Sequence, residues 1–312
     1  MRVTVLMLAL FFMAQVVGLL IVNQYIDHQQ LKEGRVSFVD LPYGIERPQV
    51  GSTASVIYML AAIFLGTLIL LIFIKFQMGN IWKIWFAFSM IVVLTVSFSP
   101  FIKIEIPYNY YIASALALLL VAWRLFRPNF YIHNITEVFI YGGLAAIFVS
   151  WLNVTAAVVL LIAISIYDMY AVWKSKHMIT MARFTAKEKV FAGMLVQYHD
   201  KKEKAAKGTA AKADYRLSSN IKNKGEVKHA ILGGGDIGFP LIFAGVVMKE
   251  LMLKHAVLLG FIETLIIVVC TTLALAYLFW KGDKGKFYPA MPYLSAGCFI
   301  GGLIVLGIEL II

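Results

Sequence analysis

Nine long apolar runs constrain this 312-residue chain more than any other feature. They cover residues 3–22, 53–74, 81–98, 108–123, 135–152, 155–173, 229–248, 255–279 and 289–312. Because an α-helix of about 20 residues crosses the hydrocarbon core of a bilayer, runs of this length predict membrane-spanning helices. The composition agrees, with 61% hydrophobic and only 14% charged residues. The sequence therefore predicts an all-α polytopic membrane protein with about nine transmembrane helices.

The first apolar run has a signal peptide as its alternative interpretation. The run is long, has Arg2 as the single charged residue before it, and lacks a small-x-small cleavage signal at its end. We therefore expect a retained span.

One hydrophilic segment, residues 174–228, divides the chain. It separates a six-span part, residues 1–173, from a three-span part, residues 229–312. Within the segment, Ile179 to Tyr198 has apolar residues at helical spacing among basic ones: Phe184, Phe191, Met194 and Leu195. This pattern predicts an interfacial helix that binds anionic lipid. The remainder has the composition of a solvated linker, although a loop that covers a functional site is the alternative.

The net charge of +11 is concentrated in this segment, which holds fourteen Lys and Arg between Lys174 and Lys228. Lys and Arg of the short connections favour the same side of the membrane as the segment. Since such residues favour the cytoplasmic side, we expect a cytoplasmic amino terminus and an external carboxyl terminus. No aromatic interleaving or binding fold accompanies the charge, so no nucleic-acid partner is predicted.

No metal or cofactor site is predicted. Cys270 and Cys298 both lie in apolar runs without paired spacing, and the six histidines are scattered. The sequence also lacks Gly-x-Ser-x-Gly, His-Glu-x-x-His and a phosphate-binding loop.

Two aspartates in consecutive apolar runs are the strongest chemical signal. A carboxylate at the centre of a membrane helix costs roughly 2.5–3.5 kcal/mol, so such residues are usually functional. Asp168 lies about five residues before the end of the sixth run, which is roughly 7–8 Å deep at the helical rise. Asp236 lies about seven residues into the seventh run, which is roughly 10 Å deep. Antiparallel helices would thus place the two carboxylates at similar depth from one face.

A carboxylate pair is suited to hydrolysis without a metal ion. Two adjacent carboxyl groups share one proton, because both cannot easily ionise side by side. The ionised group accepts a proton from water, and the protonated group donates one to the substrate carbonyl.

Three glycines, Gly233, Gly234 and Gly235, directly precede Asp236. They remove side chains, which permits a loosened helix start and the close approach of another backbone. The backbone that approaches is either a substrate or a neighbouring helix, and the residues alone leave both open.

These motifs resemble those of a known family. Tyr167-Asp168 and Gly233-Gly234-Gly235-Asp236 are similar to the YD and GxGD motifs of presenilins and signal peptide peptidases. Pro289-Ala290-Met291 resembles the Pro-Ala-Leu motif that opens the last span of that family, with Met in place of Leu. The nine spans, the cytoplasmic amino terminus and the long loop after the sixth span also resemble presenilin, and the short length is most similar to a compact microbial homologue.

The resemblance implies an intramembrane aspartyl protease whose catalytic pair is Asp168 and Asp236. It implies that substrates are transmembrane segments of other proteins, and that no cofactor is needed. It also implies a set of residues that contact the substrate: Tyr167, Gly233, Gly234, Gly235, Pro289, Ala290 and Met291.

Two other functions remain open at this point. A secondary transporter or cation channel would use Asp168, Asp236 and Glu263 as intramembrane carboxylates. The lack of internal repeats and the Pro289-Ala290-Met291 element weigh against it. An inactive scaffold is the second alternative, if Met291 marks the decay of a motif.

Other polar and small residues have a structural interpretation. Glu137 and Glu309, close to the ends of apolar runs, are expected to be hydrogen-bonded or interfacial. Gly297, Gly301 and Gly302 predict close helix packing, within one chain or between chains, so a homo-oligomer remains open.

Overall fold

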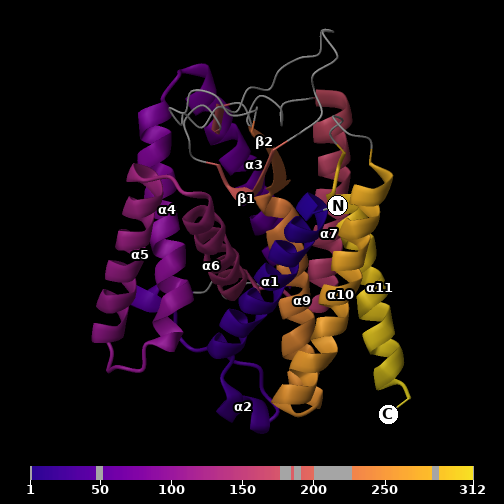
Figure 1. Ribbon diagram of the computed structural model, residues 1–312. Helices are drawn as coiled ribbons and strands as arrows, with labels where there is room; N and C mark the ends of the chain where they lie inside the picture. Colours follow the sequence, from indigo (N-terminus) through magenta and orange to yellow (C-terminus); the bar gives the residue numbers. More distant parts are fainter. Residues whose placement is uncertain are drawn as a thin grey trace.

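The computed structural model describes residues 2–46, 52–175, 184–185, 191–199, 227–282 and 288–311. Long helices dominate it (Figure 1). The first seven are α1 (Arg2–Tyr25), α2 (His28–Lys32), α3 (Ser52–Lys75), α4 (Gly79–Phe98), α5 (Tyr108–Phe126), α6 (Phe130–Phe148) and α7 (Val154–Tyr170). After these come β1 (Gly193–His199), β2 (Val227–Gly233), α9 (Gly234–Lys254), α10 (Val257–Lys281) and α11 (Met291–Glu309). Short 3-10 or π turns are η1 (Pro42–Gly44), η2 (Ser99–Phe101) and η3 (Ala171–Ser175).

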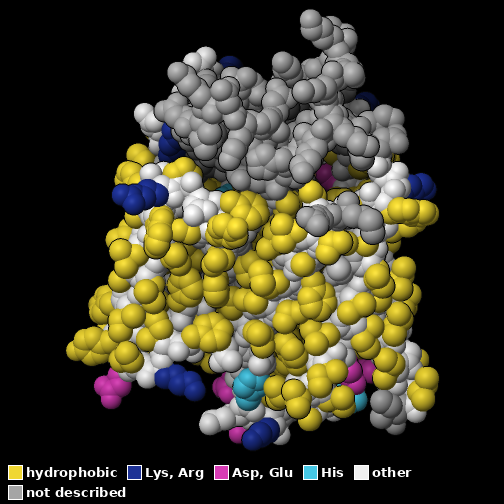
Figure 2. Space-filling model, viewed as in Figure 1, with side chains coloured by type: hydrophobic (Ala, Val, Ile, Leu, Met, Phe, Trp, Pro, Cys, Tyr) yellow, Lys and Arg dark blue, Asp and Glu magenta, His cyan; other side chains and the backbone are white. Residues whose placement is uncertain are grey.

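Seven of the described helices are long and apolar enough to cross a membrane: α1, α3, α4, α5, α7, α10 and α11. Helices α6 and α9 are also long, but they carry more polar residues. Each of the nine predicted runs therefore contains a long helix, which confirms an all-α polytopic membrane protein. On the face seen in Figure 2, hydrophobic side chains cover the middle of the molecule and charged ones lie at its two ends.

Local signals explain several helix starts. The side chain of Asn129 accepts a hydrogen bond from Tyr131 N and caps α6. The side chain of Asn153 accepts from Ala156 N at 2.8 Å and caps α7. Both bonds satisfy backbone N–H groups that a helix start leaves without an intrahelical partner.

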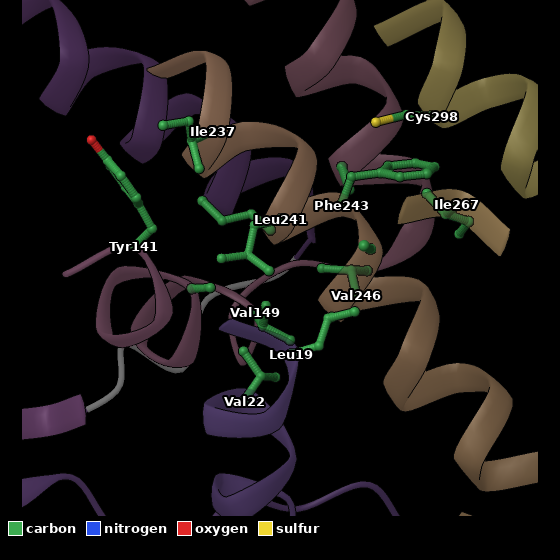
Figure 3. Packing of buried hydrophobic residues seen from close by; sticks show 14 of the residues in the cluster. Leu19, Val22, Tyr141, Val149, Ile237, Leu241, Phe243, Val246, Ile267 and Cys298 are labelled. Carbon is green, nitrogen blue, oxygen red and sulfur yellow. The ribbon is translucent and has the colours of Figure 1, made fainter. Parts of the chain in front are cut away.

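Helix α9 is the centre of the bundle. It packs against α1, α6, α7, α10 and α11, and an almost continuous stretch from Pro240 to Met252 is buried. Figure 3 shows Leu241 and Val246 of α9 facing Leu19 of α1, while Phe243 faces α10 and α11. A helix that is surrounded in this way is held by its neighbours at both ends, so the position of its first residues is well defined.

Helix α11 packs closely on α10 through two glycines. A Cβ atom added at Gly297 would lie 2.9 Å from Thr271 Cα, and one added at Gly301 would lie 2.7 Å from Ile267 Cα. The predicted glycine face is therefore an intrachain contact. Gly302 is less tightly enclosed, with Phe243 at 3.6 Å.

We expect Gly301→Ala to destabilise the protein by about 1–3 kcal/mol, because the added methyl group would overpack against the α10 backbone. Gly307→Ala is the matched control in the same helix, since nothing lies within 4 Å of a Cβ atom there. It should leave the stability unchanged or raise it slightly, because alanine favours helix. Thermal unfolding in detergent measures both. Equal melting temperatures for the two variants would contradict the close packing.

The predicted interfacial helix over residues 179–198 is wrong in its last part. Residues 193–198 belong to β1, which pairs antiparallel with β2 from Gly193↔Gly233 to His199↔Val227. Met194 and Leu195 are buried in the protein and do not face lipid. Helical spacing of apolar residues cannot reveal a strand whose backbone hydrogen bonds are made to a second strand, 27 residues further along the chain. Most of residues 179–192, and residues 200–226, lie outside the described part of the chain.

The predicted start of the seventh span at residue 229 is also wrong. Residues 227–233 form β2, and α9 begins at Gly234. Three consecutive glycines disfavour continued helix, so the helix starts within them. The prediction that divides the chain at residues 174 and 228 is not tested by this arrangement.

Candidate active site

Asp168 lies in the last turn of α7 and contacts the start of α11. Its Oδ2 accepts a hydrogen bond from Met291 N at 3.1 Å, and the backbone N–H of Ala290 donates to it as well. Asp168 therefore satisfies N–H groups at the amino terminus of another helix, where a carboxylate is favoured. One turn deeper, Ser165 Oγ and Ser295 Oγ share a hydrogen bond of 2.8 Å that joins the same two helices.

Asp236 is the third residue of α9, and its carboxylate reaches back to the chain just before the helix. The N–H of Gly233, the residue that caps α9, donates to this carboxylate. A side chain at this position that bonds the cap residue's N–H is half of a capping box. The bond holds the Asp236 side chain over the junction of β2 and α9.

The charge of Asp168 acts on the carboxyl group of Asp236, so the structure places the two aspartates within electrostatic reach of one another. Both side chains are half-buried. Asp236 lies in the first turn of its helix, not seven residues inside it, so its predicted depth is corrected. The carboxyl end of α7 and the amino ends of α9 and α11 nevertheless lie toward the end of the bundle that carries β1 and β2 (Figure 1).

The Pro289-Ala290-Met291 motif contacts Asp168 through its backbone. Ala290 and Met291 are 8% and 3% exposed, so the Met291 side chain packs inside the protein. Because the N–H group makes the bond to Asp168, methionine in place of leucine leaves that bond intact. Methionine at residue 291 is therefore compatible with an intact motif.

The three glycines have different surroundings. A Cβ atom at Gly234 would lie 2.9 Å from Tyr141 Oη, whereas one at Gly235 would meet only Phe239 at 3.4 Å. At Gly233 the nearest atom would be Asp236 Oδ2 at 3.1 Å. A close approach therefore occurs at Gly234, but the nearest neighbour is the Tyr141 side chain of α6 and not the backbone that the glycines predict.

We expect Gly234→Ala to lower the melting temperature, because the methyl group would displace the buried Tyr141 hydroxyl from its position; overpacking of this kind costs about 1–3 kcal/mol. Gly235→Ala is the matched control one residue later, and its melting temperature should stay within about 2 °C of the native value, because its Cβ meets only ordinary contact. A Gly235 variant as unstable as the Gly234 variant would contradict this packing.

The other predicted residues lie as follows. Tyr167 precedes Asp168 on α7 and is 39% exposed. Glu263 is buried in α10, and its Oε2 atom has no hydrogen-bond partner among the described residues. Glu309 pairs with Lys254 at 2.9 Å. Glu137 is 1% exposed and forms an ion pair with Arg124 at 2.5 Å, so it is hydrogen-bonded and not interfacial.

Sequence reasoning missed the side chains that hold β1. His133 Nε2 donates to Gly193 O at 2.8 Å, and Asn134 exchanges bonds of 2.8 and 3.0 Å with Leu195. Glu137 accepts from Gly193 N at 3.2 Å. The polar run from His133 to Glu137 inside an apolar segment was the available signal, since polar residues of a membrane helix need partners.

The fold and the carboxylate pair define a polytopic membrane protein with an acidic site at one end of its bundle. Residues 8–309 match the family model described as signal-peptide peptidase, presenilin aspartyl protease. No curated protein sequence matches the chain significantly.

Two solved structures of a presenilin family intramembrane aspartate protease share the fold. The structure in space group C222 has a TM-score of 0.64 at 18% identity, covering 98% of this chain and 99% of the other. The structure in space group P2 has a TM-score of 0.61 at 18% identity, covering 97% and 96%.

The chain belongs to the signal-peptide peptidase and presenilin aspartyl protease family. It is accordingly an intramembrane aspartic protease. Membership in this family favours the protease over the transporter or channel that the sequence left open.

Proposed function

We propose that Asp168 and Asp236 are the catalytic pair and that they hydrolyse peptide bonds within transmembrane segments of other proteins. The observation that carries the proposal is the meeting of these two carboxylates at adjoining helix ends, with Asp168 bonded to the Pro289-Ala290-Met291 backbone. One carboxyl group, ionised, takes a proton from a water molecule that attacks the substrate carbonyl carbon. The other, protonated, donates its proton to the carbonyl oxygen. As the C–N bond breaks, the first group passes the proton it took from water to the leaving amine, and the second takes a proton back from a hydroxyl of the tetrahedral intermediate.

A substrate segment binds, in this proposal, as an added strand on β2. One edge of β1 pairs with β2, and its other edge bonds to α6 through Gly193 and Leu195. In an antiparallel ladder, backbone groups of alternate residues point to opposite edges. The groups of Ile231, which opposes Leu195, therefore point away from β1, whereas the N–H of Gly233 bonds Asp236. No other strand pairs with β2 in the part of the chain that the structure describes.

This free edge supports binding of an extended substrate, because main-chain hydrogen bonds to a sheet edge hold a peptide in a defined register. Gly233 ends the edge three residues before Asp236, so an added strand would continue directly past the carboxylates. The exposed glycine at 235 and the half-exposed ring of Tyr167 would contact the substrate there.

The orientation of the chain follows the positive charges. We propose a cytoplasmic amino terminus, with the site near the cytoplasmic face, and an external carboxyl terminus. Arg124, which follows the fourth apolar run on that side, is buried, but the other basic residues of the connections still favour a cytoplasmic location. The partners in this proposal are single-span substrate proteins and the lipid bilayer; a homo-oligomer remains a prediction.

The test is cleavage of a single-span protein by the purified chain in liposomes, with the products mapped by mass spectrometry. We expect cuts inside the span, near its cytoplasmic end, and block of cleavage by an aspartyl-protease transition-state analogue. Products cut only outside the span, or cleavage that the analogue does not affect, would overturn the proposal.

A further inference from the structure

A buried polar cluster joins α5 and α6 to the hairpin that precedes Asp236. Arg124 of α5 is 6% exposed, and its Nη2 donates to Glu137 Oε1 at 2.5 Å and to Phe191 O at 2.8 Å. Glu137 also accepts from Gly193 N at 3.2 Å and from the Tyr141 hydroxyl. We call Arg124, His133, Asn134 and Glu137 the hairpin clamp.

The clamp bonds backbone groups of the hairpin and of the residue that leads into it. It contacts the carbonyl of Phe191 and both backbone groups of Gly193 and Leu195. A two-stranded hairpin is only marginally stable by itself, so its position depends on such contacts. The clamp occupies the edge of β1 that is opposite to β2, which leaves the second edge of β2 as the side open to a new strand.

The cluster also reaches toward the catalytic carboxylate. The Tyr141 hydroxyl, bonded to Glu137, lies against Gly234, two residues before Asp236. The charge of Asp236 acts on this hydroxyl. The clamp thus holds β2 through its pairing with β1, and Tyr141 contacts the start of α9.

A buried ion pair is a costly means of stabilisation, since apolar residues of similar volume often serve as well. We infer that the ion pair between Arg124 and Glu137 serves to fix one position of the hairpin relative to α6. The pair directs a carboxylate at one backbone N–H and a guanidinium at one backbone carbonyl. Apolar packing would hold the hairpin without specifying its register relative to α6.

We propose that the hairpin clamp positions the free edge of β2 for the substrate strand, so that Arg124, Asn134 and Glu137 are positioning residues of the protease. The proposal rests on the proposed binding of substrate at that edge. The clamp residues act by holding the hairpin in place. They take no part in the proton transfers, which Asp168 and Asp236 carry out.

The test uses Asn134→Leu, Glu137→Gln and a control. Asn134→Leu removes both bonds to Leu195 without leaving a buried charge, and so tests the clamp even if Glu137→Gln fails to fold. Glu309→Gln is the matched control, because it removes an acid from another ion pair, with Lys254. Hydrogen exchange over residues 193–199 and 227–233, melting temperature, and kcat and KM for a single-span substrate are measured in the full chain.

We expect both clamp variants to exchange these amides at least about tenfold faster, while amides of α10 and α11 keep their native rates. KM should rise about tenfold while kcat falls less than about threefold, since the variants loosen the substrate edge but not the carboxylates. The binding of a small transition-state analogue and all properties of Glu309→Gln should stay native.

If Asn134→Leu left the hydrogen-exchange rates of the hairpin amides unchanged, the proposal that the clamp holds the hairpin would be wrong. Faster exchange with an unchanged KM would overturn its role in positioning the substrate. A uniform rise in exchange over all helices would show a general stability effect and also overturn the proposal. If the native chain cuts no substrate, the proposed function fails, and the exchange measurement still decides whether the clamp holds the hairpin.

Discussion

Asp236→Asn is expected to abolish cleavage of a single-span substrate while the protein stays folded. Loss of one acid or base typically lowers a rate by 10²–10⁴-fold, so we expect a loss of at least about 10³-fold in kcat. Asparagine keeps the shape of the side chain, and its amide oxygen still accepts from Gly233 N. Asp168→Asn should give an equal loss, because hydrolysis needs both carboxyl groups.

The measurement is the single-turnover cleavage rate of each variant in liposomes, with the melting temperature as a check on folding. The double variant should be no slower than either single one, since two groups that act as a unit are not additive. Substantial residual activity in a folded variant would remove that aspartate from the catalytic pair. Loss of ion-dependent uptake, with no cleavage by the native chain, would instead favour the transporter alternative.

Ile231→Pro is expected to raise KM by about tenfold or more, because it removes a backbone N–H from the free edge of β2 where the substrate strand would bind. Proline is tolerated on an edge strand when its missing N–H faces outward. The outward direction at Ile231 follows from its partner Leu195, whose own groups bond Asn134. Steady-state kinetics with a single-span substrate measure the effect.

Ala230→Pro is the matched control, one residue earlier in the same strand. Its N–H faces β1, so proline there removes a ladder bond within the hairpin and should lower stability as well as activity. Ile231→Pro should keep the native melting temperature. An unchanged KM in Ile231→Pro would mean that the substrate does not add to β2.

The long apolar runs were sufficient to predict the class of fold, because the bilayer leaves a hydrophobic segment of that length few options besides a helix. The pairing of Asp168 with Asp236 was also predictable. Consecutive antiparallel helices place their carboxyl and amino ends at the same face of the membrane, which allows the two carboxyl groups to meet; the packing of α7 on α9 brings them near one another. The Pro289-Ala290-Met291 motif was correctly placed at the start of the last helix, because it opens the last apolar run and α11 begins at Met291.

The β1–β2 hairpin could not be predicted in this way. Its strands are separated by 27 residues, and β1 is stabilised by bonds to β2 and to Asn134 and Glu137 of α6. Local periodicity reports only which residues are apolar, so Met194 and Leu195 were read as one face of a lipid-binding helix.

The sequence by itself determined that this chain spans the membrane and carries two acids near one face of the bilayer. The free energy of placing a helix in hydrocarbon depends on the residues of that helix alone, so it can be judged from each apolar run separately. Tertiary structure decided what surrounds the acids. The bond from Met291 to Asp168 and the bonds from Asn134 and Glu137 to the backbone of β1 each join segments that are distant in the chain. Only packing specifies such contacts, because each depends on the relative position of two elements and not on the residues of either one.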